Sequence, residues 1–322
     1  MPEIRKILIV RFSSLGDIIL TFPLLKKLRR ELPGAEIHFL TGDKYAETLK
    51  LNPVIDKVIL HGISLSETRK RIRDENYDVI LDLHKNPKSI YTCFMNSKRV
   101  FRVKKENLKK LMIVKFKINL FREVIPVYKK YIHCAESVLS KSDLDFETDE
   151  LIFSRGSIFE GDYIVISPSS RHFTKTYPSE KFIEFINRYP DRKFVLSGDN
   201  SDRDKEICGY ISGQCANTVN MCGKLNISAL ANVLYYSERI ICNDSAVLHL
   251  SEALGKNVMA VFGCTVKEFG FFPQLKQSEA IENKGLKCRP CTHIGRPSCP
   301  EKHFRCMDTE INLLHSKTIN NL

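Results

Sequence analysis

The chain has 322 residues, about twice the usual length of a single domain, so it predicts two domains, and its hydrophobic content of 43% is ample for two cores. Its only early apolar run, "ILIV", is short and bounded by charges, and no stretch approaches the ~20 apolar residues of a membrane span. From these features we expect no export signal and no membrane span, and therefore a cytosolic protein whose 11 cysteines are mostly reduced.

Short apolar runs alternate with helix-like segments in the first half of the chain. We predict a helix over "DIILTFPLLKKLRREL" (17–32), in which Pro23 introduces a kink or marks the real start. Strands are predicted at "KILIV" (6–10), "AEIHFLT" (35–41), "KVILH" (57–61), "DVILDLH" (78–84) and "KRVFRV" (98–103). This alternation of strands and helices indicates a parallel sheet that is covered on both faces.

The alternation pauses across 104–150 and then resumes. Strands are predicted at 162–170, 193–199, 218–223, 239–244 and 257–263, and the helices between them at 179–189, 202–211, 227–237 and 245–254. The fold class is therefore α/β, with two Rossmann-like parallel-sheet domains. We place the boundary near 150–160, where acidic "DLDFETDE" ends, which gives domains of 1–155 and 156–322.

The positive charge is concentrated in one segment. The first 155 residues carry 30 Lys and Arg against 20 Asp and Glu, whereas the remainder carries 20 against 18. Residues 98–130 alone hold 12 basic and 2 acidic residues, interleaved with apolar ones. Such a segment indicates an anionic partner, namely a membrane surface, a phosphorylated lipid or a nucleic acid.

The loop "RFSSLGD" (11–17) follows the first predicted strand and leads into the first helix. Ligands of open α/β sheets bind at the carboxyl ends of the strands, so we expect Ser13, Ser14, Gly16 and Asp17 to lie at a binding crevice. The alternative is that Ser14 or Asp17 only caps the helix. The loop lacks the spacing of GxGxxG and of Walker A motifs.

Two loops of the second half have a similar position. "ICNDSAVLH" places Asp244 and Ser245 between a strand and a helix, where free backbone amides suit a diphosphate. "SPSSRHFTKTYP" offers Ser169, Ser170 and Lys175 after another strand. The alternatives are that Asp244 only caps the helix that follows it, and that "SPSSRHFTKTYP" is a solvated loop.

Four cysteines near the end have the spacing C-x2-C-x7-C-x6-C: Cys288, Cys291, Cys299 and Cys306. The first pair has the spacing of zinc ligands, which makes the four a candidate structural zinc site. The second pair is too widely spaced for a standard zinc ribbon, so buried thiols or occasional disulfides are the alternative.

Taken together, the motifs resemble one family. The opening "ILIVRFSSLGDIILTFPLLKKLRRELPGAEIHFLT" is followed in order by "KTYPSEKF", "ICNDSAVLHLSEALG", "VFGCT" and "CRPC…CPEKHFRCM", from about residue 4 to about residue 310. This chain is similar to the heptosyltransferases of glycosyltransferase family 9. The resemblance implies a GT-B architecture, in which two Rossmann-like domains face a cleft. It also implies transfer of a heptose from ADP-heptose to the inner core of lipopolysaccharide.

The resemblance also implies residue roles. Asp17 matches the family's catalytic base, and Lys175 matches a lysine near the donor phosphates. Asp244 matches an acidic residue that contacts the donor sugar, and the amides of Ser245 and Ala246 match the diphosphate-binding turn. His249 matches a histidine of the family's donor site. The family commonly has Thr-Gly where this chain has Ser245-Ala246, and Pro where it has Cys264.

The acceptor is expected at "DLHKNPKS" (82–89), which ends the fourth strand and resembles the family's acceptor-facing segment. Asp82, His84, Lys85 and Lys88 are the candidates to meet acceptor phosphate or acidic sugar, and a solvated strand end is the alternative. Ser13, Ser14 and Gly16 complete the predicted acceptor side.

The predicted chemistry is that of an inverting glycosyltransferase. One carboxylate removes the proton of the acceptor hydroxyl, while lysine and helix-terminal amides meet the charge of the leaving diphosphate, so no cofactor or metal is required for the chemistry. We expect the enzyme in the cytoplasm, peripheral to the inner membrane, with a lipid-linked saccharide as acceptor and an anionic membrane surface as partner. The alternatives are a same-fold transferase for another nucleotide sugar or acceptor, and a basic nucleic-acid-binding protein. We expect no nucleic acid, because no recognised binding signature is present.

Overall fold

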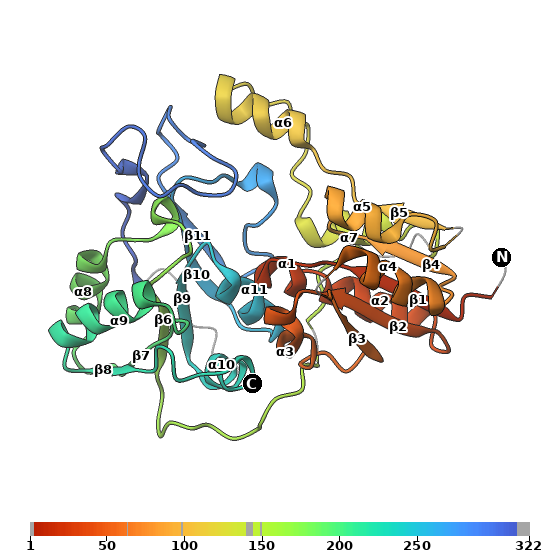
Figure 1. Ribbon diagram of the computed structural model, residues 1–322. Helices are drawn as coiled ribbons and strands as arrows, with labels where there is room; N and C mark the ends of the chain where they lie inside the picture. Colours follow the sequence, from red (N-terminus) through yellow and green to blue (C-terminus); the bar gives the residue numbers. More distant parts are fainter. Residues whose placement is uncertain (1–2, 63, 98, 140–143, 149, 314–322) are drawn as a thin grey trace. The chain divides into compact units, whose positions relative to one another are not determined.

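The computed structural model describes residues 3–62, 64–97, 99–139, 144–148 and 150–313 (Figure 1). The chain forms two compact units. Unit 1 contains Met1–Asn107 and Ile125–Phe153, and unit 2 contains Leu108–Val124 and Ser154–Leu322. The chain therefore leaves unit 1 at Leu108, contributes a short segment to unit 2, and returns at Ile125 before it leaves for good.

Unit 1 is built on a five-stranded parallel sheet with the order β3-β2-β1-β4-β5. The strands are β1 (Lys6–Val10), β2 (Glu36–Thr41), β3 (Lys57–Leu60), β4 (Val79–Asp82) and β5 (Val100–Arg102). β1 lies in the centre, where Ile7 pairs with Ile37 on one side and with Val79 on the other. Four residues of β1, from Ile7 to Val10, are fully buried, which explains its unbroken apolar sequence.

The helices of unit 1 follow the order of the strands. They are α1 (Leu15–Ile19), α2 (Phe22–Glu31), α3 (Ala46–Leu49), α4 (Leu65–Asp74), α5 (Pro87–Cys93) and α7 (Val127–Cys134), with a 3-10 turn η1 (Asp43–Tyr45). The predicted helix over 17–32 is divided, and Pro23 lies in the first turn of its second part. Proline is tolerated in a first turn because the amide there has no partner within the helix.

Unit 2 has a six-stranded parallel sheet with the order β11-β10-β9-β6-β7-β8. Its strands are β6 (Ile164–Ser167), β7 (Phe194–Leu196), β8 (Thr218–Asn220), β9 (Arg239–Asn243), β10 (Val258–Phe262) and β11 (Glu279–Glu282). The helices are α8 (Ser179–Asn187), α9 (Asp202–Gln214), α10 (Ile227–Tyr236) and α11 (Ala246–Ala253), with 3-10 turns η3 (Phe173–Lys175), η4 (Lys267–Phe269) and η5 (Arg305–Met307).

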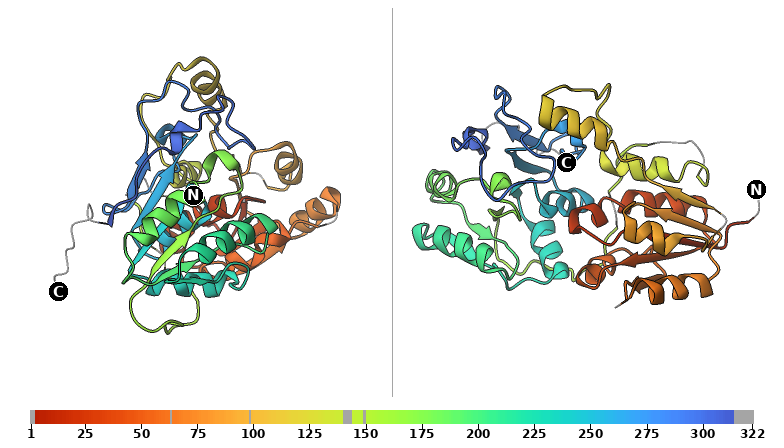
Figure 2. Two further views of the ribbon diagram at one scale, coloured as in Figure 1. Left: turned by 90° about the vertical axis from the view of Figure 1, so that its left-hand side faces the viewer. Right: turned by 45° about the horizontal axis from the view of Figure 1, so that its top comes forward.

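The helices of unit 2 form two pairs that cover the sheet. α8 packs beside α9, and α10 packs beside α11 (Figure 2). The core beneath the first pair contains fully buried aromatic side chains, among them Phe182, Phe185 and Phe194. Right-handed connections place the helices on opposite faces because the strand order reverses after β8.

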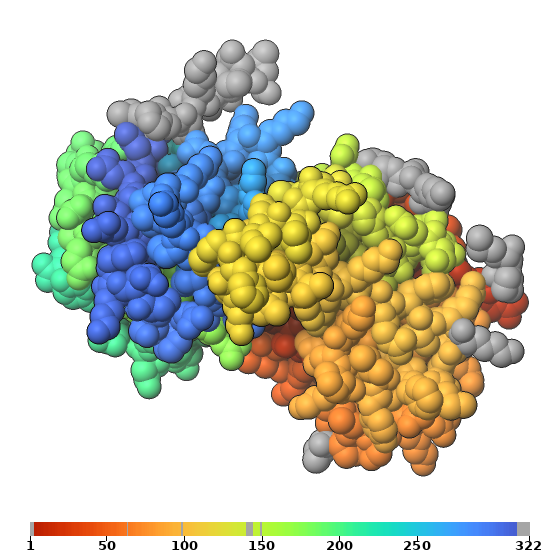
Figure 3. Space-filling model, turned by 90° about the horizontal axis from the view of Figure 1, so that it is seen from above, coloured from red at the N-terminus to blue at the C-terminus, as the bar shows by residue number. Residues whose placement is uncertain are grey.

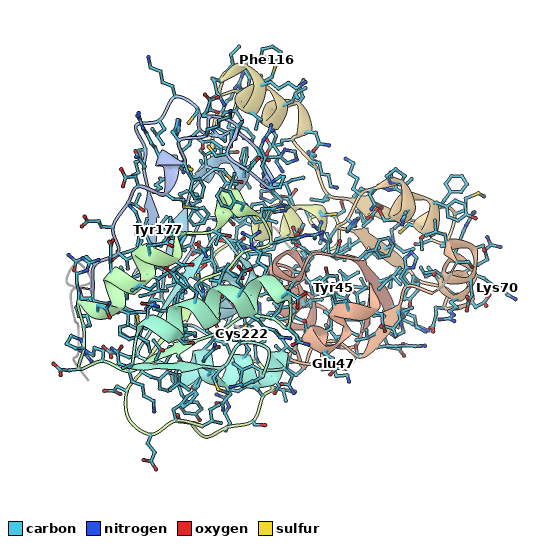
Figure 4. All side chains as sticks on the ribbon, turned by 60° about the vertical axis from the view of Figure 1, so that its left-hand side comes forward. Tyr45, Glu47, Lys70, Phe116, Tyr177 and Cys222 are labelled. Atoms are coloured by element: carbon cyan, nitrogen blue, oxygen red, sulfur yellow. The ribbon has the colours of Figure 1, made fainter. Side chains whose placement is uncertain are left out.

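The segment 108–124 packs on unit 2. α6 (Asn107–Leu111) continues as a π-helical stretch, η2 (Met112–Phe116), and Phe116 lies at its end (Figure 4). The ammonium group of Lys117 donates to the carbonyl oxygens of Cys288 and Pro290 at 3.0 and 2.6 Å. In the space-filling view this segment, coloured yellow, lies beside the C-terminal part of unit 2, coloured blue (Figure 3). Its basic and apolar residues thus form part of the unit 2 surface.

The predicted fold class is confirmed, since both sheets are parallel and helices connect their strands. Each strand predicted from the sequence forms, whereas β11 was not predicted. Within the described residues, no helix combines the length and apolar character needed to cross a membrane.

Candidate active site

The strand order reverses at one point in each sheet, and the predicted site loops lie at these two points. In unit 1 the neighbours β1 and β4 are connected in opposite directions, and the loops that follow them hold Asp17 and His84. In unit 2 the corresponding strands are β6 and β9, whose loops hold Lys175 and Asp244. A reversal of this kind opens a crevice at the carboxyl ends of the strands, which is where α/β proteins bind ligands.

The carboxylate of Asp17 accepts contacts at both of its oxygens. Arg11 Nη2 lies 2.7 Å from Oδ1, and the hydroxyl of Tyr131 donates to the same oxygen at 3.3 Å. The hydroxyl of Ser14 donates to Oδ2 at 2.6 Å, and the backbone amide of Ser14 donates to it at 3.3 Å. Ser14 is also the N-cap residue of α1. A helix-capping role and a functional role of Asp17 are therefore compatible. The same carboxylate accepts the backbone amide of the N-cap residue and lies in the predicted binding loop.

These contacts keep Asp17 ionised. Burial by itself would raise the pKa of this carboxyl, but the guanidinium of Arg11 and the hydrogen bonds from Ser14 outweigh burial and lower the pKa below its ordinary value. Burial raises the pKa of the Tyr131 hydroxyl, so the tyrosine stays a neutral donor. Arg11 is itself fixed by a 2.6 Å hydrogen bond from Nη1 to the carbonyl oxygen of Leu83.

Asp82 was predicted as an acceptor contact, and the structure corrects this. Its side chain is fully buried. Oδ1 accepts from the backbone amides of His84 and Lys85 at 3.1 and 2.7 Å, and Oδ2 accepts from the hydroxyl of Ser89 at 3.0 Å. Asp82 therefore shapes the loop after β4 and supports the start of α5, and its side chain presents no exposed surface to an acceptor.

His84 and Lys88 differ in their surroundings. The His84 ring lies against Phe12, with ring centres 5.2 Å apart, and burial, aided by the charges of Arg11 and Lys105, lowers the pKa of His84 to about 4. His84 is thus neutral at physiological pH, and its buried Nδ1 has no hydrogen-bond partner among the described residues. Lys88 is exposed at the first turn of α5.

In unit 2, two of the predicted donor residues form a single ion pair. Lys175 Nζ lies 2.7 Å from Asp244 Oδ2, and the two side chains are only 14% and 5% exposed. The hydroxyl of Thr265 donates to the same carboxylate oxygen at 2.7 Å. Lys175 ends the 3-10 turn η3, while Asp244 follows β9 directly. The ion pair therefore crosses the point where the strand order of this sheet reverses.

The turn after Asp244 leads into α11. Ser245 is the N-cap residue and Ala246 the first helical residue, so the backbone amides of the first turn lack partners within the helix. The buried hydroxyl oxygen of Ser245 has no hydrogen-bond partner in the part of the chain that the structure describes. His249 is buried on the same helix, with its ring 6.0 Å from that of Phe271. This turn has the geometry of an anion site.

Ser169 and Ser170 lie in the loop after β6, and both are buried. The hydroxyl of Ser169 donates to Asp204, which also accepts the backbone amide of Asp199 at 2.8 Å. The carbonyl oxygen of Ser170 accepts the hydroxyl of Thr176 at 3.4 Å. In this structure the two serines hold the loop that carries Lys175.

The zinc hypothesis for the C-terminal cysteines is not supported. In the described residues, no three or more side chains of His, Cys, Asp or Glu come together as a metal-binding group. Cys291 is paired with Cys264 by a thiol hydrogen bond, which raises the pKa of Cys264 and lowers that of Cys291. Cys288 Sγ lies 3.8 Å from His303 Nε2, and Cys306 is buried, while Cys299 is half-buried. The four cysteines therefore lie near enough to influence one another's charge, but the described residues do not bring them together as a metal-binding group.

Sequence reasoning missed Arg11 and Tyr131. Arg11 is the first residue of the loop that holds Asp17, so a basic residue so near this carboxylate could have indicated the contact from the sequence. Tyr131 lies 114 residues away on α7, and only the fold brings it to the carboxylate.

Comparison with known proteins decides the family. The model of glycosyltransferase family 9 (heptosyltransferase) matches residues 66–301, which is well over half of the chain. The chain belongs to glycosyltransferase family 9. It is thus a glycosyltransferase, as the sequence resemblance predicted.

Named relatives and solved structures resemble this family 9 glycosyltransferase over most of its length. Lipopolysaccharide heptosyltransferase 1 of Campylobacter coli is 27% identical over 295 residues, covering 81% of this chain and 84% of the relative. Lipopolysaccharide heptosyltransferase 1 of Pseudomonas aeruginosa PAO1 is 23% identical over 312 residues, covering 89% and 86%.

Among solved structures, E. coli ADP-heptose lps heptosyltransferase II has a TM-score of 0.70 at 19% identity, covering 94% of this chain and 97% of that one. E. coli heptosyltransferase WaaC with ADP has a TM-score of 0.69 at 18% identity, covering 90% and 95%. The same enzyme has also been solved with ADP-2-deoxy-2-fluoro heptose. These similarities confirm that the fold is of the GT-B type.

Proposed function

We propose that this family 9 glycosyltransferase transfers a heptose from ADP-heptose to the inner core of lipopolysaccharide, with inversion at the anomeric carbon. The observation that carries the proposal is the ionised carboxylate of Asp17, held by Arg11 at the strand-order reversal of unit 1. Support for the donor and the acceptor comes from the relatives, which are named as lipopolysaccharide heptosyltransferases, and from solved neighbours that hold ADP and an ADP-heptose analogue.

In the proposed reaction, Asp17 receives the proton of the acceptor hydroxyl. The acceptor oxygen then forms a bond to the anomeric carbon of the heptose as the bond from that carbon to the diphosphate oxygen breaks. The electron pair of the broken bond leaves with ADP. One carboxylate suffices because the sugar is transferred in a single displacement, without a covalent sugar–enzyme intermediate.

We assign donor binding to unit 2 and acceptor binding to unit 1. The ammonium of Lys175 and the backbone amides of Ser245 and Ala246 meet the charge that gathers on the diphosphate, so that the protein itself supplies the stabilisation of the leaving group. Asp244 and His249 line the same turn and contact the sugar of the donor. In unit 1, Ser13, Gly16, His84, Lys85 and Lys88 remain candidates for acceptor contacts.

We also propose that the enzyme works in the cytoplasm at the surface of the inner membrane, held by the segment 108–124 within the basic stretch 98–130. The positive charge and the exposed apolar side chains of this segment support the proposed membrane contact. Leu108 is 68% exposed and Phe116 is 61% exposed, and Lys115 beside them is also exposed. Apolar side chains among basic ones are typical of surfaces that bind anionic membranes, because both parts contribute to the affinity.

A same-fold transferase for another nucleotide sugar is the second candidate. It is favoured by Ala246 and Cys264, which stand where the family commonly has Gly and Pro. A nucleic-acid-binding protein is not supported, since the chain belongs to a glycosyltransferase family.

A panel of nucleotide sugars tests the donor. The purified protein is incubated with ADP-heptose, ADP-glucose, UDP-glucose and GDP-mannose, each with a heptose-free inner-core acceptor, and products are detected by mass spectrometry. We expect product with ADP-heptose at least tenfold above any other donor. Preferential use of another donor would contradict the proposed donor and favour the second candidate.

A further inference from the structure

We propose that the hydroxyl of Ser14 relays the proton of the acceptor to Asp17, so that the base acts through the serine and not by direct contact. This inference rests on the proposed function and names the path of the proton within the same site. It starts from the crowding of the Asp17 carboxylate.

An ionised carboxylate has about four lone-pair positions for hydrogen bonds. In Asp17 each oxygen already has two donors. Oδ1 receives Arg11 Nη2 and the Tyr131 hydroxyl, and Oδ2 receives the hydroxyl and the backbone amide of Ser14. The side chain of Asp17 is also only 17% exposed. An acceptor hydroxyl that approached this carboxylate directly would have to displace one of these donors.

The four donors differ in what they can do with a proton. The guanidinium of Arg11 stays protonated, and a backbone amide does not exchange its proton for that of a sugar hydroxyl during catalysis. The hydroxyl of Tyr131 is buried, and burial raises its pKa. Ser14 is exposed, and a serine hydroxyl accepts hydrogen bonds while it donates one. Of these four groups, the hydroxyl of Ser14 is the one that belongs to an exposed residue and can both receive and pass on a proton.

The distances fit the relay. The Ser14 hydroxyl lies 2.6 Å from Asp17 Oδ2, which is typical of a charge-assisted O–H···O contact. In the relay, the acceptor hydroxyl gives its proton to Ser14 Oγ while the Ser14 proton passes to Asp17 Oδ2. The acceptor oxygen attacks the anomeric carbon in the same step, and ADP leaves with the electron pair. At the end Ser14 is a neutral hydroxyl again and Asp17 is protonated.

Arg11 and Tyr131 are positioning residues in this scheme. Both contact Oδ1, so they fix the carboxylate and leave Oδ2 directed at Ser14. Their pairing, with the guanidinium 5.7 Å from the centre of the Tyr131 ring, keeps the two donors together.

The test must separate the relay from the helix-capping role of Ser14. Glycine is nearly as good an N-cap as serine but carries no hydroxyl, whereas threonine keeps both the cap and the hydroxyl. We therefore compare Ser14→Gly with Ser14→Thr in single-turnover transfer from ADP-heptose. The control is Ser64→Gly, because Ser64 caps α4 in the same unit through the amide of Glu67 and lies outside the site.

The relay predicts that Ser14→Gly slows the single-turnover rate by about 10²-fold, the usual effect of a lost proton-transfer group, while ADP binds as in wild type. Ser14→Thr should stay within about tenfold of wild type, and Ser64→Gly should be unaffected. When the single-turnover rate of the wild type is plotted against the fraction of heavy water in the solvent, it should decrease along a curve and not a straight line, because two protons move in one step.

The possible outcomes distinguish a failure of the proposed relay from a failure of the proposed function. Wild-type turnover by Ser14→Gly, with Asp17→Asn inactive, would overturn the relay and leave Asp17 as a direct base. An equal loss in Ser14→Gly and Ser14→Thr, or a straight line in the isotope experiment, would also overturn it. Absence of heptose transfer by the wild type would instead refute the proposed function.

Discussion

Lys175 and Asp244 form a nearly buried ion pair across the strand-order reversal of unit 2, with 2.7 Å between the ammonium nitrogen and a carboxylate oxygen. Thr265 completes the coordination of that oxygen. Because the same ammonium is the proposed partner of the donor diphosphate, donor binding competes with Asp244 for it. We therefore expect the pair to affect both the stability of unit 2 and the proposed binding of ADP.

Replacing Lys175 should strongly destabilise unit 2. Lys175→Met leaves the carboxylate of Asp244 buried without its counter-charge, and loss of one partner of a buried pair costs ~3 kcal/mol of the free energy of unfolding. The control is Lys181→Met, since Lys181 pairs with Asp308, which is 77% exposed, and such a pair contributes at most ~1 kcal/mol. Urea denaturation of the three proteins measures both. Equal stability of the two variants would contradict the importance of the buried pair.

Substitution of Lys175 and substitution of Asp244 should have different effects on the affinity for ADP. Lys175→Met removes a charged hydrogen bond to the diphosphate and should weaken ADP binding by ~10–100-fold. Asp244→Asn releases the ammonium from its counter-charge, so ADP should bind as well as in wild type or more tightly. Calorimetric titration decides this, at a temperature where both variants are folded. A loss of ADP affinity only in Asp244→Asn would show that the lysine does not face the phosphates.

His84 should make the protein sensitive to acid. Burial, with the charges of Arg11 and Lys105, lowers the pKa of His84 to about 4 in the folded state, against an ordinary value near 6.5. Between these values the unfolded chain binds the proton and the folded chain does not. Stability is therefore lost as the pH falls from 6.5 to 4, and no further loss from this group follows below 4. The difference in pKa sets an upper limit of ~3 kcal/mol, and solvent screening of the half-buried ring reduces the expected loss to about 2 kcal/mol.

The His84→Gln variant isolates this contribution. Its free energy of unfolding should fall less than that of wild type between pH 7 and pH 4.5, as measured by urea denaturation at each pH. Parallel pH dependence in the two proteins would contradict a neutral, buried His84.

Much of the fold could be predicted because the strands are short, uniformly apolar runs. "KILIV" and "VMAVF" are buried on both faces of their sheets, so their sequences do not alternate and stand out from the helices. β11, with the sequence "EAIE", escaped prediction because a half-buried edge strand with two glutamates lacks that signal. Pro23 correctly marked a helix start.

The candidate site could be predicted only where its residues are close in sequence. The loop from Ser13 to Asp17 and the turn from Asp244 to Ala246 each combine a strand end with a helix start, and both lie at strand-order reversals. The contact of Tyr131 with Asp17 depends on the packing of α7 against α2, which no local pattern encodes. The role of Asp82 was misjudged because its burial follows from the loop that it supports.

The exposed apolar side chains of the segment 108–124 should determine membrane binding. Replacing Leu108 and Phe116 together by Ser removes two exposed apolar groups and should weaken binding to phosphatidylglycerol vesicles by at least ~10-fold. Ile158→Ser is the matched control, because Ile158 is 54% exposed in the same unit but far along the chain. Vesicle sedimentation at low and high salt measures the affinity. Unchanged binding of the double variant would leave this segment without a membrane role.

Transfer by Asp17→Asn is the most direct test of the account. The wild type and this variant are incubated with ADP-heptose and a heptose-free inner-core acceptor, and the product is quantified by mass spectrometry, with ADP affinity measured in parallel. The account predicts that the wild type adds heptose, that Asp17→Asn is slower by ~10²–10⁴-fold, and that both bind ADP equally. Near-wild-type transfer by Asp17→Asn, or no heptose transfer by the wild type, would contradict it.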